Sequence, residues 1–458
     1  MKNLHKRVDY LMISGSYVPR FFGLHPGLAR KQRKNSGRLF SAYSAESVSL
    51  KKFFSPLHPE IYLIPGDMFG EVRDEFGENI GFERMNFPFS SYDFFIDEDA
   101  KGAFEYIKHS PLFFRLGQIP QLCYLVPPRQ TTSRRNENIW YLAPLFPHTR
   151  WLHSLLTGIL AELILARNGF SAKERAPFVL AAAFHDIAMP AGGDSIVRID
   201  KKNLHEENNF LWVLRREGVL EELEKKFNFD AVKAERWIRG QEMPGKLIDI
   251  ADKMSYVAMD CYYVGLNQKG MIRKFCQKNP LVMDVWQDVR IDKKSQQIYF
   301  ESAERLYRFL LLRAYEHSEF LLNPYSRSMD FYLTKMTKVL YNKGLISRED
   351  LLIYGNSWLE GKLQQIFPGN FKTIICPDEL RWRKFSTENE QLVFAKRIGS
   401  RLDHLDNIKG FNPGLDWLVK SGGEITPLIN TLKPSQVEKM RKIVASTKGY
   451  YVYYNPDG

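Results

Sequence analysis

Three apolar segments between residues 150 and 265 of this 458-residue chain carry ionisable side chains at positions that a helix would bury. In residues 151–166, leucine and isoleucine recur with helical spacing, and His153 lies on the same stripe. Burying an imidazole costs free energy unless it is paired or ligated, although a single histidine in such a helix is more often a hydrogen-bonded core residue. The segment therefore predicts a buried helix whose histidine needs a partner.

The adjacent pair His185 and Asp186 ends a second apolar segment, residues 178–187. Neighbouring side chains at a helix end are about 100° apart, so both can reach one point. An imidazole beside a carboxylate suits Mn, Fe, Mg or Zn. The dipeptide alone is common by chance. Its assignment to a metal site is strengthened by the two other predicted helices, which also carry ionisable side chains at buried positions.

A third helix is predicted for residues 246–264, after the breaker pair Pro244 and Gly245. Asp252, Tyr256 and Asp260 recur every four residues and form one polar face. A solvated stripe is the alternative explanation for such a face.

Together the three segments predict a divalent-metal site with two histidine and two aspartate ligands. The predicted ligands are His153, His185, Asp186 and Asp252. Four ligands leave room for water, which suits a hydrolase that lowers the pKa of the water and neutralises phosphoryl oxygens. Arg150 and Lys253 are placed in sequence to hold phosphate charge beside that site.

The composition agrees with a soluble protein that attracts anions. Lys and Arg number 65 against 53 Asp and Glu, a formal charge of +12, which favours nucleotides or nucleic acid as partners. A basic run at residues 30–34 is either a polyanion-binding arm or a solvated loop. Four scattered cysteines, no signal-type apolar run and no stretch of ~18 apolar residues lead us to expect a cytoplasmic protein without a membrane segment.

These motifs resemble the HD superfamily, and within it the dNTP triphosphohydrolases, which include bacterial dGTPases and the human SAM-and-HD-domain dNTPase. Residues 150–154 are similar to the R-x-x-H-S segment of that branch, residues 183–187 to its H-D helix, and residues 252–260 to its D-K-x-D-Y-x-x-R-D helix. Residues 112–122 resemble L-F-Q-R-L-x-x-I-x-Q-L, and residues 313–317 resemble R-A-Y-x-H. The ordered matches span about residues 110–320.

The resemblance implies hydrolysis of a deoxynucleoside triphosphate to deoxynucleoside and tripolyphosphate by a homo-oligomer. It implies metal ligation by the four residues named above, phosphate contact by Arg150 and Lys253, and a catalytic role for His205. It also implies sugar contacts, which fall on Gln121, Tyr256, Asp260 and Tyr315.

The sequence departs from the branch after the H-D pair, where Met189 and Asp194 replace two histidines. Ser255 and Met259 also replace an aspartate and an arginine of the third helix. Losing two imidazoles removes candidate proton donors. Either Asp194 shares proton transfer with His205, or the pocket takes another phosphoester.

Two alternatives to the triphosphohydrolase therefore stay open. One is an HD phosphohydrolase of another nucleotide, such as a monophosphate or a signalling nucleotide. The other is a non-catalytic nucleotide- or nucleic-acid-binding protein that keeps its metal site for structure or sensing.

The expected fold class is mainly α. We predict an irregular N-terminal lobe over residues 1–105, an HD helical core over 106–325 and a mixed α/β lobe over 326–458. Further helices are predicted for residues 301–322 and 329–342, and strands for residues 372–376 and 450–454.

Overall fold

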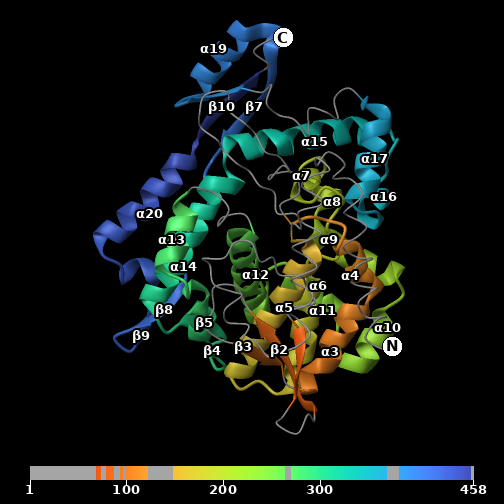
Figure 1. The fold of residues 1–458 in the computed structure, drawn as a ribbon, viewed down its shortest axis with the longest axis vertical. Helices are drawn as coiled ribbons and strands as arrows, with labels where there is room; N and C mark the ends of the chain where they lie inside the picture. The colour runs from red at the N-terminus through yellow and green to blue at the C-terminus, as the bar shows by residue number, and fades with distance from the viewer. Residues whose placement is uncertain are drawn as a thin grey trace, which may run out of the picture. The chain divides into compact units, whose positions relative to one another are not determined.

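The computed structural model describes residues 69–73, 79–86, 93–96, 98–121, 148–263, 270–368 and 381–454, all within one compact unit. The fold is mainly helical with small sheets, as the sequence predicts (Figure 1). The predicted lobe boundaries stay predictions. The basic run at 30–34 and the predicted strand at 372–376 lie outside the described residues. In the described part of the chain, no helix has the length and apolarity needed to cross a membrane.

Three packed helices form the centre of the core: α5 (Arg150–Arg167), α6 (Ala172–Phe184) and α12 (Glu242–Tyr263). Helices α5 and α6 approach closely because small residues line their contact. A Cβ added to Gly158 would lie 3.0 Å from the Cβ of Ala183. The apolar segments that predicted α5 and the end of α6 are buried.

Helix α12 begins earlier than the sequence predicts, because Pro244 and Gly245 lie inside its first turn. Proline is tolerated there, since its missing N–H has no intrahelical acceptor to bind. Gly245 is required by close packing, because a Cβ at this position would come within 2.6 Å of the carbonyl oxygen of Trp237. The pair therefore starts the helix rather than preceding it.

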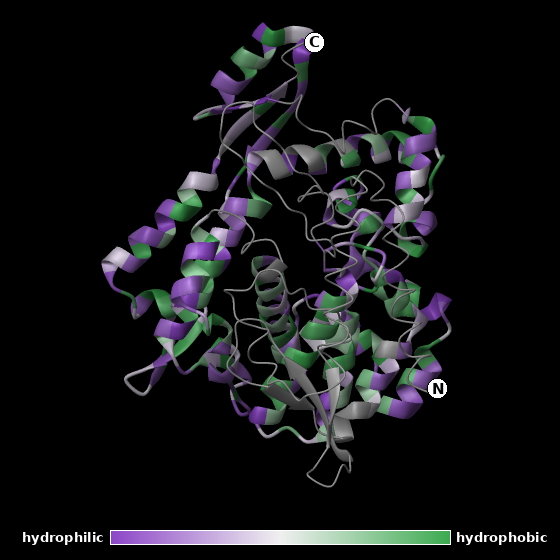
Figure 2. Cartoon of the chain, viewed as in Figure 1, coloured by the Kyte–Doolittle hydropathy of each residue, from purple (hydrophilic) through white to green (hydrophobic). Residues whose placement is uncertain are grey.

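The remaining helices surround this core or extend from it. They are α3 (Glu98–His109), α4 (Pro111–Leu116), α7 (Asp194–Val197), α8 (Lys201–Leu204), α9 (Glu206–Arg216), α10 (Leu220–Phe227), α11 (Ala231–Ile238), α13 (Met271–Lys278), α14 (Ala303–Glu316), α15 (Pro324–Asn342), α16 (Arg348–Ile353), α17 (Asn356–Ile366), α19 (Glu388–Ile398) and α20 (Pro434–Thr447). The helix predicted for 301–322 is α14 followed by a π-helical turn at His317–Leu321. Helix α20 alternates hydrophilic and hydrophobic residues along its length (Figure 2).

Three small sheets accompany the helices. The first has the order β1-β2-β3 (Phe69–Arg73, Asn79–Asn86, Asp93–Ile96). The second has the order β4-β5-β8-β9 (Val289–Asp292, Gln297–Phe300, Leu418–Ser421, Glu424–Pro427), with β5 parallel to β8. The third has the order β6-β10-β7 (Arg381–Phe385, Gly449–Tyr454, Leu402–Ile408), and its central strand is the one predicted at residues 450–454.

The third sheet is joined to α15 by stacked rings and by ion pairs. The ring of His404 lies between those of Phe331 and Tyr453, with centroid distances of 3.5 and 4.2 Å. Arg327 donates two hydrogen bonds of 2.8 Å to the carboxylate of Asp406. These contacts connect the C-terminal strands to the helical part of the fold.

Candidate metal centre

The four predicted metal ligands come together where α5, the end of α6 and α12 meet. His153 Nε2 lies 3.2 Å from His185 Nε2 and 3.1 Å from Asp252 Oδ1. Asp252 Oδ1 is 3.5 Å from His185 Nε2, and Asp186 Oδ2 is 3.6 Å from His153 Nε2. His153 and Asp186 are buried, and Asp252 is partly accessible.

Hydrogen bonds on the far side of each imidazole direct Nε2 toward this centre. His185 Nδ1 donates to the carbonyl oxygen of Ala182 at 2.8 Å. His153 Nδ1 donates to Ser255 Oγ at 3.0 Å, and the Ser255 hydroxyl donates to the carbonyl oxygen of His153 at 2.9 Å. Such bonds fix the tautomer and orientation of metal-binding histidines.

The donor atoms fit a divalent cation. With both Nδ1 atoms donating, two Nε2 lone pairs face each other, which is repulsive unless positive charge lies between them. Separations of 3.1–3.6 Å between donor atoms suit an ion about 2.0–2.2 Å from each of them. Two imidazoles and two carboxylates suit several divalent transition metals, so the donor set does not select one of them.

The pKa shifts at the centre point to the same need for positive charge. Burial lowers the pKa of His185, but Asp186 and Asp252 outweigh burial and raise it to about 9. Burial also opposes ionisation of Asp252, yet the adjacent His153 and His185 hold the pKa of that carboxyl well below its usual range. The two carboxylates thus favour a positive charge at this point, which a divalent ion would supply.

Arg150, predicted to contact phosphate, is bound by two carboxylates. Its Nη1 donates to Asp186 Oδ2 at 2.7 Å, and its Nη2 donates to Asp194 Oδ2. The guanidinium therefore orients one of the metal ligands. Asp194, predicted to share proton transfer, is its ion-pair partner.

Lys253, the other predicted phosphate contact, lies beside different residues. Its ammonium pairs with Asp249, one turn earlier on α12, and lies 5.7 Å from the ring centroid of Trp417. Among the described residues these are its ion-pair and cation–π partners.

Three of the predicted sugar contacts lie on the polar face of α12 or are linked to it by hydrogen bonds. His148 Nε2 lies 2.6 Å from Asp260 Oδ1, and the backbone N–H of Gln121 donates to the carbonyl oxygen of His148 at 3.1 Å. The hydroxyl of Tyr256 accepts a hydrogen bond of 2.5 Å from Arg313 Nε. Asp260 and Tyr256 follow Asp252 on the same face of α12, as the spacing predicts.

Tyr315 is placed differently from the other predicted sugar contacts. Its ring lies 5.7 Å from that of Phe275, and the ammonium of Lys439 on α20 is 5.8 Å from its centroid. Arg313 and Glu316, on the same helix, instead contact the polar face of α12. Burial and the neighbouring Asp260 raise the pKa of Glu316 well above its usual range.

His205 begins α9 and lies beside Glu206, which the sequence analysis did not identify. His205 Nδ1 is 3.5 Å from Glu206 Oε2. Burial, together with the charges of Asp194 and Asp186, raises the pKa of Glu206 to about 8. Glu206 therefore lies within electrostatic range of the metal centre and is protonated at neutral pH.

The other missed residues are His148, Arg313 and Glu316. His148 lies two positions before Arg150, and the other two lie inside the segment that resembles R-A-Y-x-H. Their partners are distant in sequence, so spacing alone gave no signal for them.

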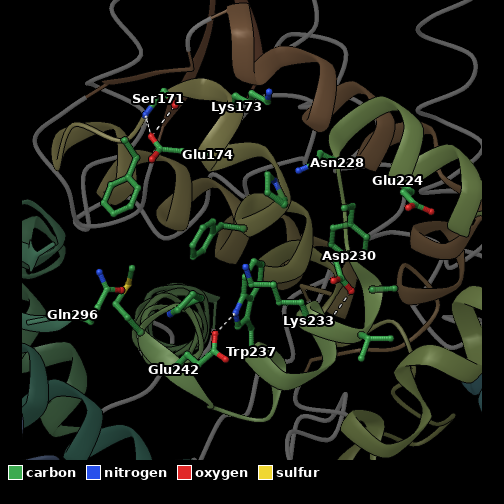
Figure 3. A pocket seen from close by; sticks show the side chains of 18 of the residues that line it. Ser171, Lys173, Glu174, Glu224, Asn228, Asp230, Lys233, Trp237, Glu242 and Gln296 are labelled. Atoms are coloured by element: carbon green, nitrogen blue, oxygen red, sulfur yellow. Dashed lines mark hydrogen bonds between the residues drawn. The ribbon is translucent and has the colours of Figure 1, made fainter. Parts of the chain in front are cut away.

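A separate cavity of about 1290 Å³ lies at the opposite end of α6, between that helix, α10 and α11 (Figure 3). Trp237 Nε1 donates to Glu242 at 3.1 Å at its edge. Lysine and carboxylate side chains both line it, so its charge is mixed. Because His185 follows the C-terminal end of α6, this cavity is distinct from the metal centre.

Comparisons with known proteins identify a shared fold. No family model and no curated protein matches the sequence. A solved hypothetical protein from Aquifex aeolicus is similar, with 17% identity and a TM-score of 0.60 over 85% of this chain and 97% of its own. A phosphohydrolase from Bacteroides thetaiotaomicron VPI-5482 matches with 16% identity and a TM-score of 0.57 over 84% of this chain and 99% of its own. The chain thus has a fold that a phosphohydrolase also uses, and the likeness does not single out a dNTP triphosphohydrolase.

Proposed function

We propose that this protein is a metal-dependent phosphohydrolase that acts on a nucleotide. The observation that carries the proposal is the convergence of His153, His185 and Asp186, with Asp252 in contact with both imidazoles, at the meeting point of α5, α6 and α12. The fold shared with a solved phosphohydrolase supports it. A centre kept only for structure would need no partly accessible ligand, whereas Asp252 is 30% exposed.

The residues of the chain have distinct roles in this proposal. His153, His185, Asp186 and Asp252 would hold the divalent ion. When bound, such an ion lowers the pKa of a water molecule and neutralises phosphoryl charge. Ser255 holds the imidazole of His153, and Arg150 holds the carboxylate of Asp186.

We assign the leaving-group proton to His205 and Glu206 together. Glu206 is buried beside Asp194 and Asp186 and holds a proton at neutral pH, so it can donate to a leaving oxygen. Asp194 is less suited to this role than the sequence suggested, because its carboxylate is bound to the guanidinium of Arg150.

Two substrate classes are candidates. A deoxynucleoside triphosphate is favoured by the ordered motifs and by the grouping of Gln121, Asp260 and Tyr256 at the polar face of α12. A nucleotide with fewer phosphates is favoured by the ion pair that Asp194 makes with Arg150. The homo-oligomeric state and the cytoplasmic location stay predictions.

The test is metal analysis of the purified protein, followed by assays of nucleoside mono-, di- and triphosphates with Mn or Mg and identification of the phosphate product. We expect turnover in the wild type and its loss, with loss of bound metal, in His185→Ala. His109→Ala is the matched control, because that histidine is exposed on α3 and pairs only with Glu105 among the described residues. Equal activity in His185→Ala and wild type would refute catalysis at this centre, and salt-sensitive nucleic-acid binding without hydrolysis would favour the binding protein.

A further inference from the structure

We infer that Asp194 limits how many phosphate groups the substrate carries, so that the wild-type site prefers a nucleotide with a single phosphate over a triphosphate. The inference rests on the proposed function and names the substrate class of that same site. It starts from the contact between Asp194 and Arg150, the residue predicted to hold phosphate.

The two amino groups of the Arg150 guanidinium have different surroundings. Nη1 binds Asp186 at 2.7 Å in the buried interior, where the side chains are 7% and 4% exposed. Nη2 binds Asp194, whose side chain is 66% exposed. Carboxylate and phosphate oxygens bind a guanidinium in the same way, so Asp194 occupies the position that a phosphate arriving from solvent would take.

The backbone before Asp194 is fixed. Gly192 and Gly193 have φ values of 88° and 62°, which favour glycine, and a Cβ on Gly192 would lie 2.4 Å from Ile196 Cγ1. The N–H of Gly192 donates to Asn356 Oδ1 at 2.8 Å, and the N–H of Ala191 donates to the carbonyl oxygen of Leu351 at 2.8 Å. Asp194 is therefore held at the start of α7 and is not free to swing away with its loop.

Arg115 holds the same loop from the other side. Its guanidinium donates to the carbonyl oxygens of Ile187 and Met189, and also to that of Leu351 on α16. The segment from the H-D pair to Asp194 is thus braced against α4 and α16. This backbone positions the carboxylate of Asp194 against Arg150. Moving the carboxylate away breaks the ion pair and relieves no strain elsewhere.

The charge around Arg150 argues against a long phosphate chain. Two carboxylates, Asp186 and Asp194, bind one guanidinium, and the acid Glu206 lies within electrostatic range of it. In the part of the chain that the structure describes, Lys253 is already paired with Asp249. A divalent ion and Arg150 can balance a single phosphate, but each added phosphate meets Asp194 as a like charge.

The decisive experiment compares wild type, Asp194→Asn and Asp194→Glu. The asparagine variant keeps the shape and a hydrogen bond to Arg150 but removes the charge, and the glutamate variant keeps the charge. Binding of orthophosphate and of tripolyphosphate to the Mn-loaded protein is measured by calorimetry, with thermal melts to confirm folding. We expect Asp194→Asn to bind tripolyphosphate at least about tenfold more tightly, with little change for orthophosphate, and Asp194→Glu to resemble wild type.

Catalysis gives a second readout. The ratio of kcat/KM for a nucleoside triphosphate to that for the monophosphate should rise about tenfold in Asp194→Asn. An unchanged or smaller tripolyphosphate preference in Asp194→Asn overturns the inference, whether or not any nucleotide is hydrolysed. Absence of turnover with every nucleotide, in wild type and variant alike, refutes the proposed function instead, so the two failures are distinguishable.

Discussion

Ser255 illustrates how one substitution can keep a site intact with different chemistry. The resembling branch has an aspartate at this position, and Ser255 instead accepts from His153 Nδ1 while donating to the backbone of the same residue. The hydroxyl orients the imidazole as a carboxylate does, but adds no negative charge to an interior that already holds Asp186 and Asp252. The departure from the family pattern is therefore compatible with metal binding.

We predict that Ser255→Ala weakens metal affinity by about 10- to 100-fold, because His153 Nδ1 loses the partner that fixes its tautomer. Competition with a chelating dye measures the effect. Ser154→Ala is the control. Ser154 is a buried serine on α5 that follows His153 in the sequence, and its hydroxyl makes no hydrogen bond to that residue. Equal metal affinity in Ser255→Ala and wild type would contradict the assigned role.

The raised pKa of Glu206 predicts that the stability of the fold depends on pH. The folded-state pKa of Glu206, about 8, lies above the ordinary value of 4.5, so its contribution to stability is complete below pH 4.5 and is lost as pH rises through 8. Glu206→Gln removes this dependence, and the variant should gain roughly 4 kcal/mol relative to wild type between pH 5 and pH 9.

Urea unfolding at several pH values measures that difference. If Glu206 is the proton donor, kcat of the wild type also falls above pH 8, and Glu206→Gln is slow at every pH. A stability difference that does not change with pH would exclude a buried, protonated Glu206.

At the scale of elements, helices were predictable where one periodic pattern spans a whole segment. Helix α5 could be predicted from the helical spacing of its leucines and isoleucines, and the end of α6 from its alanine-rich sequence. Helix α12 was predicted to start four residues late, because Pro244 and Gly245 act as breakers locally but serve as a first turn once α11 packs against them. Local rules missed the tertiary reason for Gly245.

Strands and partners were less predictable because they depend on distant pairing. Strands β4, β5, β8 and β9 have four residues each, too few for an alternating pattern to stand out. Within the site, the convergence of the four predicted metal ligands followed from their residue types and the helices that carry them. The contact of His148 with Asp260 and that of Arg150 with Asp194 were not predicted, since no spacing rule connects them.

A run of exposed basic residues in the described part of the chain lies on an edge strand. Edge strand β6 exposes Arg381, Trp382, Arg383 and Lys384, and Trp382 is 47% accessible. Basic edge strands protect a sheet from pairing with other chains, and cations beside an exposed aromatic ring also suit single-stranded nucleic acid.

We expect a fluorescent oligonucleotide to bind at low salt, with the double change Arg383→Gln and Lys384→Gln lowering the slope of log K against log salt by about 1.4. Lys225→Gln with Lys226→Gln, on α10, is a control of equal charge. If both double variants show the same salt dependence of binding, β6 does not bind the oligonucleotide, and its basic residues serve only to prevent pairing with other chains.

At the scale of the whole molecule, the metal ion should stabilise the fold, because its ligands come from three helices that pack together only in the native state. Metal at 100 times its Kd should add about 2.7 kcal/mol to the free energy of unfolding. Thermal melts before and after chelation test this, with a lower Tm expected for the stripped protein. His185→Ala should show no shift on adding metal, and a shift as large as that of wild type would place the binding elsewhere.

The parallel pairing of β5 with β8 sets the order in which the chain can fold during synthesis. Phe300 of β5 pairs with Val419 of β8, and its ring stacks on that of Trp417 at a centroid distance of 5.5 Å. Strand β5 therefore obtains its partner β8 only after more than a hundred further residues have been made. Until then the nascent chain carries an open strand edge, which favours association with other chains. Ribosome-bound chains that stop before β8 should therefore need a chaperone, whereas chains that include β9 should not.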